Sequence, residues 1–351
     1  MANILILGAG MMGTAFAWPL VDAGHTVRLV GTHLDDAIIA ALKSGEPHPK
    51  LKLAVPTGIT PFASHELEVA ARDVDAIVLG VSSAGVRWAG EKLRDVMRDD
   101  VPIGMISKGL AWNGRELVSL PDVLATVLSE RGGATFAPVG VGGPCIAGEL
   151  ARRVDTCVVM TGRNARHVSA LATLARGPYY RIFPSADVVG VEVSAALKNA
   201  FAMGVGFAAG LHERAGGAAG SVAMHNHEAA VFAEAAVEMA RVVTLAGGHA
   251  ESAAGLAGVG DLNVTCNGGR TGRFGRWLGL GLTLPDAILK MEGATLECLE
   301  ILDVMAEAVA GWEAQGKLQP RELPLLRHLI GVAKGRPAHP VPFETFFGGP
   351  S

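Results

Sequence analysis

The chain is poor in cysteine, in aromatic residues and in charge. Its 351 residues include four cysteines, which stand far apart and form no CxxC pair. This argues against a zinc knuckle or a dithiol redox site and favours a reducing compartment. Charged residues make up 18% of the chain and the formal net charge is −4. Such a small, mixed charge argues against a nucleic-acid binder.

No segment is typical of a membrane span or a signal peptide. The most apolar stretch, around Ala200 to Leu211, is rich in glycine and too short to cross a bilayer. The N-terminal MANILILGAGMMG has neither a basic region nor a cleavage site. Half of the residues are hydrophobic, which is ample for a buried core, and the length predicts two domains. We therefore expect a soluble, cytoplasmic protein.

The two halves of the chain differ in the pattern of their apolar residues. Up to about residue 188, short apolar runs alternate with helical patterns, which predicts an α/β domain with a doubly wound, mostly parallel sheet over residues 1–188. After about Asp187 the patterns are helical, so an all-helical domain is expected over residues 189–335, followed by a tail over residues 336–351. Strands are expected at Asn3–Leu7, Thr26–Val30, Ala76–Val81, Pro102–Ser107, Pro138–Val141, Thr156–Met160 and Tyr179–Phe183.

A glycine motif follows the first expected strand. The sequence GAGMMG begins at Gly8 and has the GxGxxG spacing, with a strand before it and a helix after it. Gly8 allows a tight turn, Gly10 lets the backbone approach a pyrophosphate, and Gly13 lets the helix pack on the strand. The motif therefore predicts a Rossmann-like dinucleotide site; a glycine-rich turn of another α/β fold is the alternative.

The second strand ends without an acidic residue. An NAD site places an acid there to accept hydrogen bonds from the ribose, whereas this chain has Thr32 and His33. Both side chains could contact a 2′-phosphate, which favours NADP over NAD slightly. Asp35 and Asp36 are expected to cap the next helix.

Two polar residues interrupt an apolar helical pattern, SAALKNAFAMGVGFAAGL. Lys198 and Asn199 lie in a segment that is apolar on every other face, as buried helices are. A buried ammonium group needs a partner or a lowered pKa, and a lowered pKa suits proton transfer. Lys198 could instead reach solvent along its own stem. Asp261 is either its partner or a helix cap.

Three further segments offer ligand groups. Lys108 follows a strand and is expected at the carboxyl edge of the sheet, where ligands bind. The stretch GPCIA, from Gly143, opens a helix, and GGRTGR, from Gly268, combines a helix start with two arginines and so suits an anion. Each could also be an ordinary solvated turn. His225 and His227 point apart on a helix, so no metal site is expected.

Together these segments resemble the NAD(P)-dependent sn-glycerol-3-phosphate dehydrogenases, most closely their archaeal-type form. The matching stretches are ILGAGMMGTA, VGTHLDD with SGEPHPKL, LGVSSAG, ISKGL, GGPCIAGELARR, SAALKNAFAMGVG, GLAGVGDLNVTCNGGR and MEGAT. The resemblance implies reversible hydride transfer between NAD(P)H and dihydroxyacetone phosphate in a homodimer. Lys198 would give the proton to the carbonyl oxygen, Lys108 and Asn199 would hold that oxygen or the nicotinamide amide, Asp261 would orient Lys198, and Thr265 would lie beside them.

The resemblance also assigns binding residues. The substrate would be bound by Lys108, Gly143, Cys145, Lys198, Asp261, Gly269, Arg270 and Thr271. The cofactor would be bound by Gly8, Gly10, Met11, Met12, Gly13, Thr32, Lys108, Ala147, Arg270, Lys290 and Glu292.

Four residues depart from the pattern of that family. Thr271 replaces an asparagine, Cys145 replaces a serine, threonine or alanine, and Glu228 and Glu234 replace a lysine and an arginine. The alternatives are therefore a related dehydrogenase, with a helical domain like that of 6-phosphogluconate dehydrogenase, that acts on another 2-keto or polyol substrate, and a nucleotide-sensing protein without catalysis.

Overall fold

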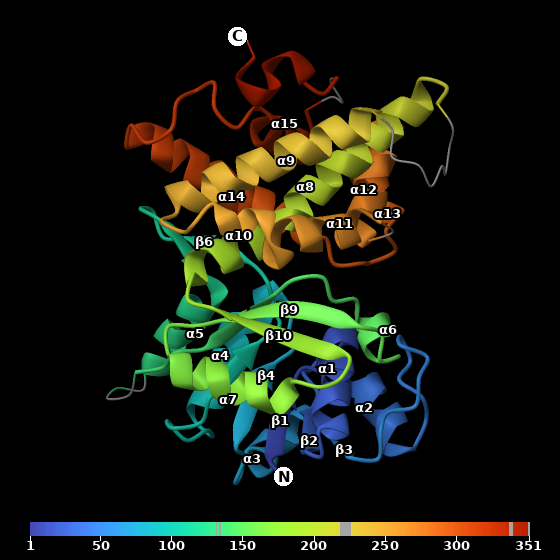
Figure 1. Ribbon diagram of the computed structural model, residues 1–351. Helices are drawn as coiled ribbons and strands as arrows, with labels where there is room; N and C mark the ends of the chain where they lie inside the picture. Colours follow the sequence, from blue (N-terminus) through green and yellow to red (C-terminus); the bar gives the residue numbers. More distant parts are fainter. Residues whose placement is uncertain (131, 133–134, 218–225, 268, 337–339, 350–351) are drawn as a thin grey trace. The chain divides into compact units, whose positions relative to one another are not determined.

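The computed structural model describes all residues except 131, 133–134, 218–225, 268, 337–339 and 350–351 (Figure 1). The chain divides into two compact units. Unit 1 comprises Met1–Lys108 and Ser119–Val188, and unit 2 comprises Gly109–Val118 and Val189–Ser351. Two segments differ from the expected division: the hairpin segment Gly109–Val118 belongs to unit 2, and so does the tail, whose Val341 and Phe346 are buried in the helical core.

Unit 1 is built on an eight-stranded sheet in the order β10-β9-β8-β5-β4-β1-β2-β3. The strands are β1 (Asn3–Leu7), β2 (Thr26–Val30), β3 (Ile59–Phe62), β4 (Ala76–Leu79), β5 (Ile103–Met105), β8 (Val139–Gly142), β9 (Thr156–Thr161) and β10 (Tyr180–Ser185). Neighbouring strands are parallel except β8 and β9, which are antiparallel. The predicted doubly wound, mostly parallel sheet is confirmed.

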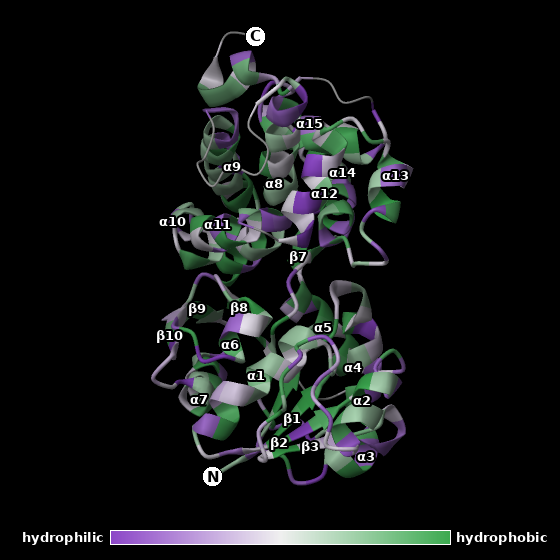
Figure 2. Ribbon diagram, turned by 90° about the vertical axis from the view of Figure 1, so that its right-hand side faces the viewer, coloured by the Kyte–Doolittle hydropathy of each residue, from purple (hydrophilic) through white to green (hydrophobic). Residues whose placement is uncertain are grey.

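Helices cover both faces of this sheet (Figure 1). They are α1 (Met11–Asp22), α2 (Asp36–Lys43), α3 (Leu67–Ala70), α4 (Val86–Arg94), α5 (Leu120–Ser129), α6 (Ala147–Leu150) and α7 (Ala165–Ala175). Strand β1 shows why both faces are covered: Ile4 and Ile6 enter one core cluster, and Leu5 and Leu7 enter the other. Successive side chains of a strand point to opposite faces, so a strand that is apolar throughout needs a layer on each side. Figure 2 shows green, hydrophobic residues along the central strands.

Unit 2 is helical apart from the hairpin of β6 (Leu110–Trp112) and β7 (Leu117–Ser119), whose last residue lies in unit 1. Its helices are α8 (Val188–Arg214), α9 (Asn226–Leu245), α10 (Glu251–Ala254), α11 (Asp261–Cys266), α12 (Arg270–Gly279), α13 (Leu284–Leu289), α14 (Glu297–Ala314) and α15 (Pro324–Ala333). Helix α8 has 27 residues and could cross a membrane by length and composition. However, 89% of its most apolar window is buried inside the protein, as in a core helix.

Helices α8 and α12 touch backbone to backbone through glycines. A Cβ atom on Gly206 would lie 2.1 Å from the carbonyl oxygen of Gly272, and one on Gly275 would lie 2.0 Å from that of Met203. Only glycine allows so close an approach. The start of α12 is thereby held at a defined place relative to the polar residues of α8.

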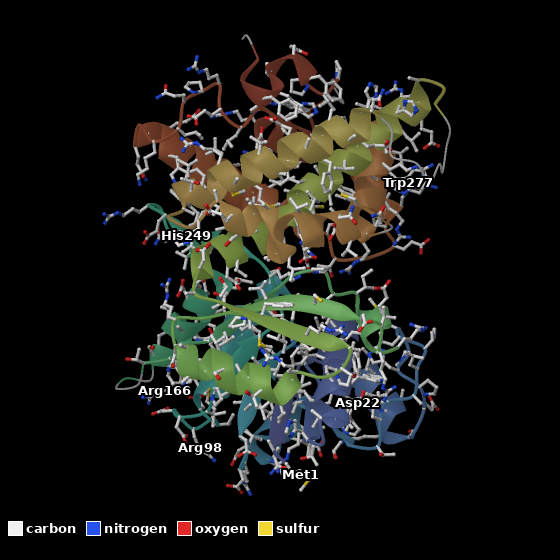
Figure 3. All side chains as sticks on the ribbon, viewed as in Figure 1. Met1, Asp22, Arg98, Arg166, His249 and Trp277 are labelled. Carbon is white, nitrogen blue, oxygen red and sulfur yellow. The ribbon has the colours of Figure 1, made fainter. Side chains whose placement is uncertain are left out.

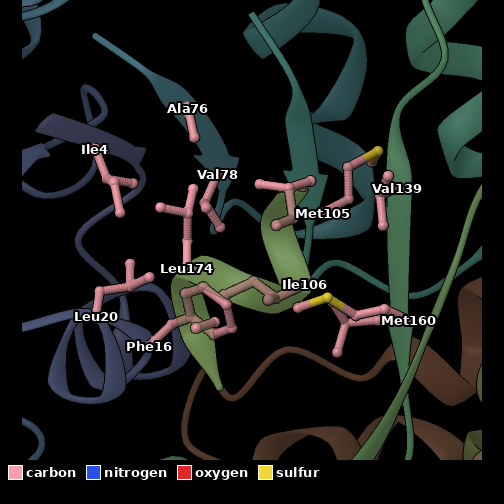
Figure 4. Close-up of a pocket in the computed structure, with 14 residues that line it drawn as sticks. Ile4, Phe16, Leu20, Ala76, Val78, Met105, Ile106, Val139, Met160 and Leu174 are labelled. Atoms are coloured by element: carbon pink, nitrogen blue, oxygen red, sulfur yellow. The ribbon is translucent and has the colours of Figure 1, made fainter. Parts of the chain in front are cut away.

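The pocket drawn in Figure 4 lies inside unit 1 and offers nothing for a polar ligand. Its lining residues, among them Ile4, Phe16, Val78 and Met160, are apolar side chains and one glycine. Ligand sites need a few convergent polar groups to fix orientation. We interpret this space as imperfect packing between the sheet and its helices.

Candidate functional site

The three glycines of the loop between β1 and α1 differ in what surrounds them. Gly8 has a φ of 113°, and a Cβ atom there would lie 2.7 Å from the backbone of Gly80. A Cβ atom on Gly13 would lie 2.1 Å from the carbonyl oxygen of Gly8, whereas one on Gly10 would meet nothing within 4 Å. Folding thus requires glycine at the first and third positions, and the space over Gly10 is open to a ligand.

This loop lies where dinucleotides bind in doubly wound folds. From β1 the next strands in the chain, β2 and β3, lie on one side, and from β4 the later strands lie on the other side. The connections therefore reverse direction between β1 and β4, which makes this boundary the topological switch point. The first turn of α1 begins at Met11, and its N–H groups have no intrahelical acceptor. These groups and the open space over Gly10 fit a pyrophosphate.

The prediction that the Asp35 side chain caps α2 is wrong. It occupies the N-cap position, but its side chain makes no capping bond. Its Oδ2 instead accepts from the N–H and the hydroxyl of Thr32, both at 2.8 Å, and from the N–H of Ala9 at 3.2 Å. The Thr32 hydroxyl donates its only hydrogen to Asp35 and accepts from the N–H of Leu34, so in this arrangement it has no hydrogen left for a 2′-phosphate.

Lys108 reaches the loop that follows β8. Its Nζ donates to the carbonyl oxygen of Gly143 at 3.2 Å, and Gly143 has a φ of 120°, which favours glycine. Cys145 follows in this loop and Ala147 begins α6, and both are half-buried. The structure therefore brings together three of the residues expected around the substrate: Lys108, Gly143 and Cys145.

In unit 2, Lys198 and Asp261 form an ion pair. The distance between Lys198 Nζ and Asp261 Oδ1 is 2.6 Å; the lysine side chain is 13% exposed and the aspartate 1%. Asp261 was predicted to be either the partner of Lys198 or a helix cap. The structure shows that it is the partner of Lys198, and it is also the first residue of α11. Two opposite charges so deeply buried compensate each other, so Asp261 fixes the position of the Lys198 ammonium.

Polar neighbours surround this pair. The Thr265 hydroxyl donates to the carbonyl oxygen of Asp261 at 2.7 Å, and Asn199 Nδ2 donates to Glu297 Oε2 at 2.9 Å. Burial raises the pKa of the Cys266 thiol to about 12, with Lys198 nearby opposing the rise. Cys266 is therefore a neutral thiol and no nucleophile at neutral pH. Glu297 was missed in the sequence because nothing marks a helix-start glutamate as a partner for a distant amide.

The glycine–arginine loop opens α12 at Arg270. Gly269 is the N-cap, Arg270 is exposed, and a Cβ atom on Gly269 would lie 2.4 Å from the carbonyl oxygen of Thr265. Thr271, by contrast, is buried. Gly268 lies outside the described residues.

Lys290 and Glu292 are exposed near the end of α13. The Lys290 ammonium lies 5.8 Å from the ring centroid of Trp277, which Figure 3 labels. Among the described residues, no group of three or more His, Cys, Asp or Glu side chains could hold a metal ion. His225 lies outside the described residues.

Comparisons with known proteins decide the family. Residues 3–168 match the family described as NAD-dependent glycerol-3-phosphate dehydrogenase N-terminus, and residues 187–338 match the family described as its C-terminus. An Archaeoglobus fulgidus protein, "NADP(+)-dependent glycerol-3-phosphate dehydrogenase", is 32% identical over 289 residues, 82% of this chain and 83% of that protein. The chain belongs to the NAD-dependent glycerol-3-phosphate dehydrogenase family.

Further members of the glycerol-3-phosphate dehydrogenase family are similar over nearly the whole chain. A Corynebacterium aurimucosum protein, "Glycerol-3-phosphate dehydrogenase [NAD(P)+]", is 29% identical over 95% of this chain and 93% of its own length. The crystal structure of glycerol-3-phosphate dehydrogenase from Coxiella burnetii superposes with a TM-score of 0.79 at 27% identity, covering 95% of this chain and 94% of that one. The family expected from the motifs is thus confirmed.

Glu234, one of the departures within this dehydrogenase family, has a structural role here. It is buried, and its Oε2 accepts from the N–H of Phe347 in the C-terminal segment at 3.0 Å. One helical turn on, buried Glu238 accepts from the N–H groups of Leu325 and Leu326 at the start of α15, at 2.7 and 2.8 Å. Glu234 thus ties the C-terminal segment to α9, a task that its sequence position did not suggest.

The two glutamates also make stability depend on pH. Burial raises the pKa of Glu238 from 4.5 to about 8, the backbone N–H groups oppose the rise, and the charge of Glu234 adds to it. Because this folded-state pKa lies above the unfolded value, the stabilisation is complete below about pH 4.5 and is lost as the pH rises through about 8.

We expect the thermal midpoint to fall between about pH 4.5 and about pH 8, and Glu234→Gln to flatten that fall. The glutamine oxygen can still accept from Phe347, and its amide can donate to an ionised Glu238. Differential scanning calorimetry across this range is the measurement, with Glu228→Gln on the same helix as control. A Glu234→Gln curve parallel to the wild type contradicts the interpretation.

Proposed function

We propose that the protein interconverts dihydroxyacetone phosphate and sn-glycerol 3-phosphate with NAD(P)H or NAD(P)⁺. Membership of the glycerol-3-phosphate dehydrogenase family supports this reaction. The observation that supports it best is the nearly buried Lys198 ammonium, held at 2.6 Å by Asp261 in the helical unit. Reducing a ketone to an alcohol with a hydride requires one proton, and such a lysine can deliver it.

The proposed reaction assigns a different task to the cofactor and to each residue of the site. The nicotinamide cofactor supplies the hydride to the carbonyl carbon, or accepts it in reverse. Lys198 Nζ gives its proton to the carbonyl oxygen and takes it back during oxidation, while Asp261 holds the ammonium in place. Lys108 and Asn199 would hold that oxygen or the nicotinamide amide, and Glu297 fixes the Asn199 amide. The Thr265 hydroxyl, which donates to the Asp261 carbonyl, supports the start of α11.

The substrate phosphate would bind at the start of α12. Arg270 is exposed there beside the helix N-terminus, and Gly269 permits close approach. Gly143 and Cys145 are also proposed to contact the substrate. Thr271, although largely buried, is also proposed to contact the substrate.

Arg270→Ala should raise the KM for dihydroxyacetone phosphate by about 10- to 100-fold with a smaller change in kcat. One charge-assisted contact of about 1.5–3 kcal/mol would be lost. Steady-state kinetics at saturating cofactor measures the effect, and Arg321→Ala, an exposed arginine of the same unit outside this loop, is the control. An unchanged KM in Arg270→Ala would place the phosphate elsewhere.

The cofactor is proposed to bind across the glycine loop, with a slight preference for NADP over NAD. The residues that directly follow strand β2, Gly31 to Leu34, include no acid. The Asp35 carboxylate is nevertheless bound to Thr32, and Thr32 offers no free hydroxyl hydrogen, so the preference is slight. The residues proposed to contact the cofactor are Gly8, Gly10, Met11, Met12, Gly13, Thr32, Lys108, Ala147, Arg270, Lys290 and Glu292.

We expect the kcat/KM for NADPH to equal or exceed that for NADH. The two values are measured with one ketone at a fixed, saturating concentration. A strong preference for NADH would show that the missing acid does not set the choice.

Oxidation of sn-glycerol 3-phosphate tests the proposed reaction in the other direction. The reduced cofactor should appear together with an equal amount of dihydroxyacetone phosphate, and Lys198→Met should form neither. Reduced cofactor without dihydroxyacetone phosphate would point to another alcohol as substrate.

We also propose that the protein is a cytoplasmic homodimer. No disulfide joins any of the four cysteines, Cys145, Cys157, Cys266 and Cys298, which suits a reducing compartment. The glycines Gly206 and Gly275 pack against backbone within the chain. The proposal of a dimer therefore rests on the family resemblance alone. Size-exclusion chromatography with light scattering tests it, because the measured mass should be twice that of one chain.

A further inference from the structure

Ala9, between Gly8 and Gly10, has both backbone polar groups bound by side chains. Its N–H donates to Asp35 Oδ2 at 3.2 Å. Its carbonyl oxygen accepts from the Thr14 hydroxyl at 3.1 Å and lies 3.0 Å from His48 Nε2. Ala9, Thr14 and His48 are fully buried, and Asp35 is nearly so. The peptide groups on either side of Ala9 are thus held from within the protein.

The environment of His48 determines which ring nitrogen is protonated. Its Nδ1 accepts from the N–H groups of Lys50 at 3.2 Å and Leu51 at 3.1 Å, so Nδ1 has no hydrogen. The hydrogen must then be on Nε2, which donates it to the carbonyl oxygen of Ala9. His48 thereby connects two loops that are 39 residues apart in the sequence.

Asp35 connects the same loop to the end of β2. A single oxygen, Oδ2, accepts from Ala9 and twice from Thr32, so the glycine loop and the β2 loop share one anchor. Because Ala9 is saturated by the protein, its polar groups cannot turn toward a ligand. The donors left for a phosphate are the N–H groups at the start of α1, beyond Gly10.

We propose that Asp35 and His48 are positioning residues for the dinucleotide: they lock Ala9 so that the glycine loop already has its binding conformation before the cofactor arrives. This rests on the cofactor role proposed for the loop. Without Asp35 the buried Ala9 N–H has no acceptor, and without His48 the Ala9 carbonyl oxygen keeps only the Thr14 hydroxyl, so in either case the peptide is held less firmly. A loop that is competent for only a fraction of the time binds its ligand more weakly by that same fraction.

The test compares two replacements of one residue. His48→Gln can still accept from Lys50 or Leu51 and reach Ala9 with its amide N–H, whereas His48→Asn keeps the acceptor but is too short to reach Ala9. The dissociation constant of NADPH is measured by calorimetry on the full chain, beside the KM for dihydroxyacetone phosphate at saturating cofactor. Asp35→Ala is measured in the same way, with its exposed neighbour Asp36→Ala as control.

We expect His48→Asn and Asp35→Ala to weaken NADPH binding about tenfold, and His48→Gln and Asp36→Ala to stay within about twofold of the wild type. The ketone KM should be unchanged. Equal NADPH affinities for His48→Asn and His48→Gln, with or without a common loss of thermal stability, would overturn the proposal.

Gly10→Val separates this failure from a failure of the proposed function. If Gly10→Val loses NADPH while His48→Asn and Asp35→Ala bind it normally, the locking role is wrong and the cofactor site stands. If Gly10→Val also binds normally, the glycine loop is not the cofactor site and both proposals fall.

Discussion

Lys198→Met is expected to lower kcat by about 10²- to 10⁴-fold, the usual contribution of a general acid. The dissociation constant of NADPH should change little, because the lysine gives a proton and does not hold the cofactor phosphates. Stopped-flow kinetics with dihydroxyacetone phosphate measures the turnover, and titration measures the cofactor affinity. Lys317→Met, an exposed lysine of the same unit, is the control.

A loss of activity in Lys198→Met could also come from unfolding, because the substitution leaves Asp261 buried without its cation. Breaking such a pair costs about 3–5 kcal/mol. The double variant Lys198→Met/Asp261→Asn removes the charge and should recover much of the thermal stability while staying inactive. Recovery of activity together with stability would show that Lys198 is structural and not the proton donor.

Gly10→Val is expected to weaken NADPH binding about 100-fold, while the protein folds normally. A Cβ atom at Gly10 meets nothing within 4 Å, so the valine occupies only the space proposed for the pyrophosphate. Loss of two charge-assisted hydrogen bonds, at about 1.5 kcal/mol each, accounts for this factor. Calorimetric titration gives the affinity, and thermal unfolding gives the stability.

Gly13→Ala should behave in the opposite way. Its Cβ atom would lie 2.1 Å from the carbonyl oxygen of Gly8, so the loop must distort and the thermal midpoint must fall. Unchanged NADPH affinity in Gly10→Val, or unchanged stability in Gly13→Ala, contradicts the roles that we assign to the two glycines.

The elements best predicted from the sequence are those that strong local patterns mark. Strands β1 and β2 were predicted residue for residue, since each is a continuous apolar run between turns. Strand β3 was missed because ITPF is short and contains Pro61, which an edge strand tolerates. The β6–β7 hairpin was missed because three-residue strands have too little periodicity to be noticed.

The site was predictable in its residues but not in its contacts. The sequence identified Lys198 and Asp261, yet 63 residues separate them, and only the fold distinguishes a partner from a cap. Asp35 shows the limit most clearly: its position before α2 predicts a cap, and its carboxylate binds Ala9, 26 residues earlier. Glu234 looked like a lost cation, whereas its oxygen holds the C-terminal segment. Local rules cannot anticipate partners that only tertiary folding brings near.

The substrate is the central claim, and one matched pair of ketones tests it most directly. Oxidation of NADPH is followed with dihydroxyacetone phosphate and with dihydroxyacetone, which differ only in the phosphate that Arg270 is proposed to bind. We expect turnover of dihydroxyacetone phosphate with a kcat/KM above about 10⁴ M⁻¹s⁻¹ and little or none of dihydroxyacetone. An inert phosphorylated ketone beside efficient turnover of an unphosphorylated one would contradict the account.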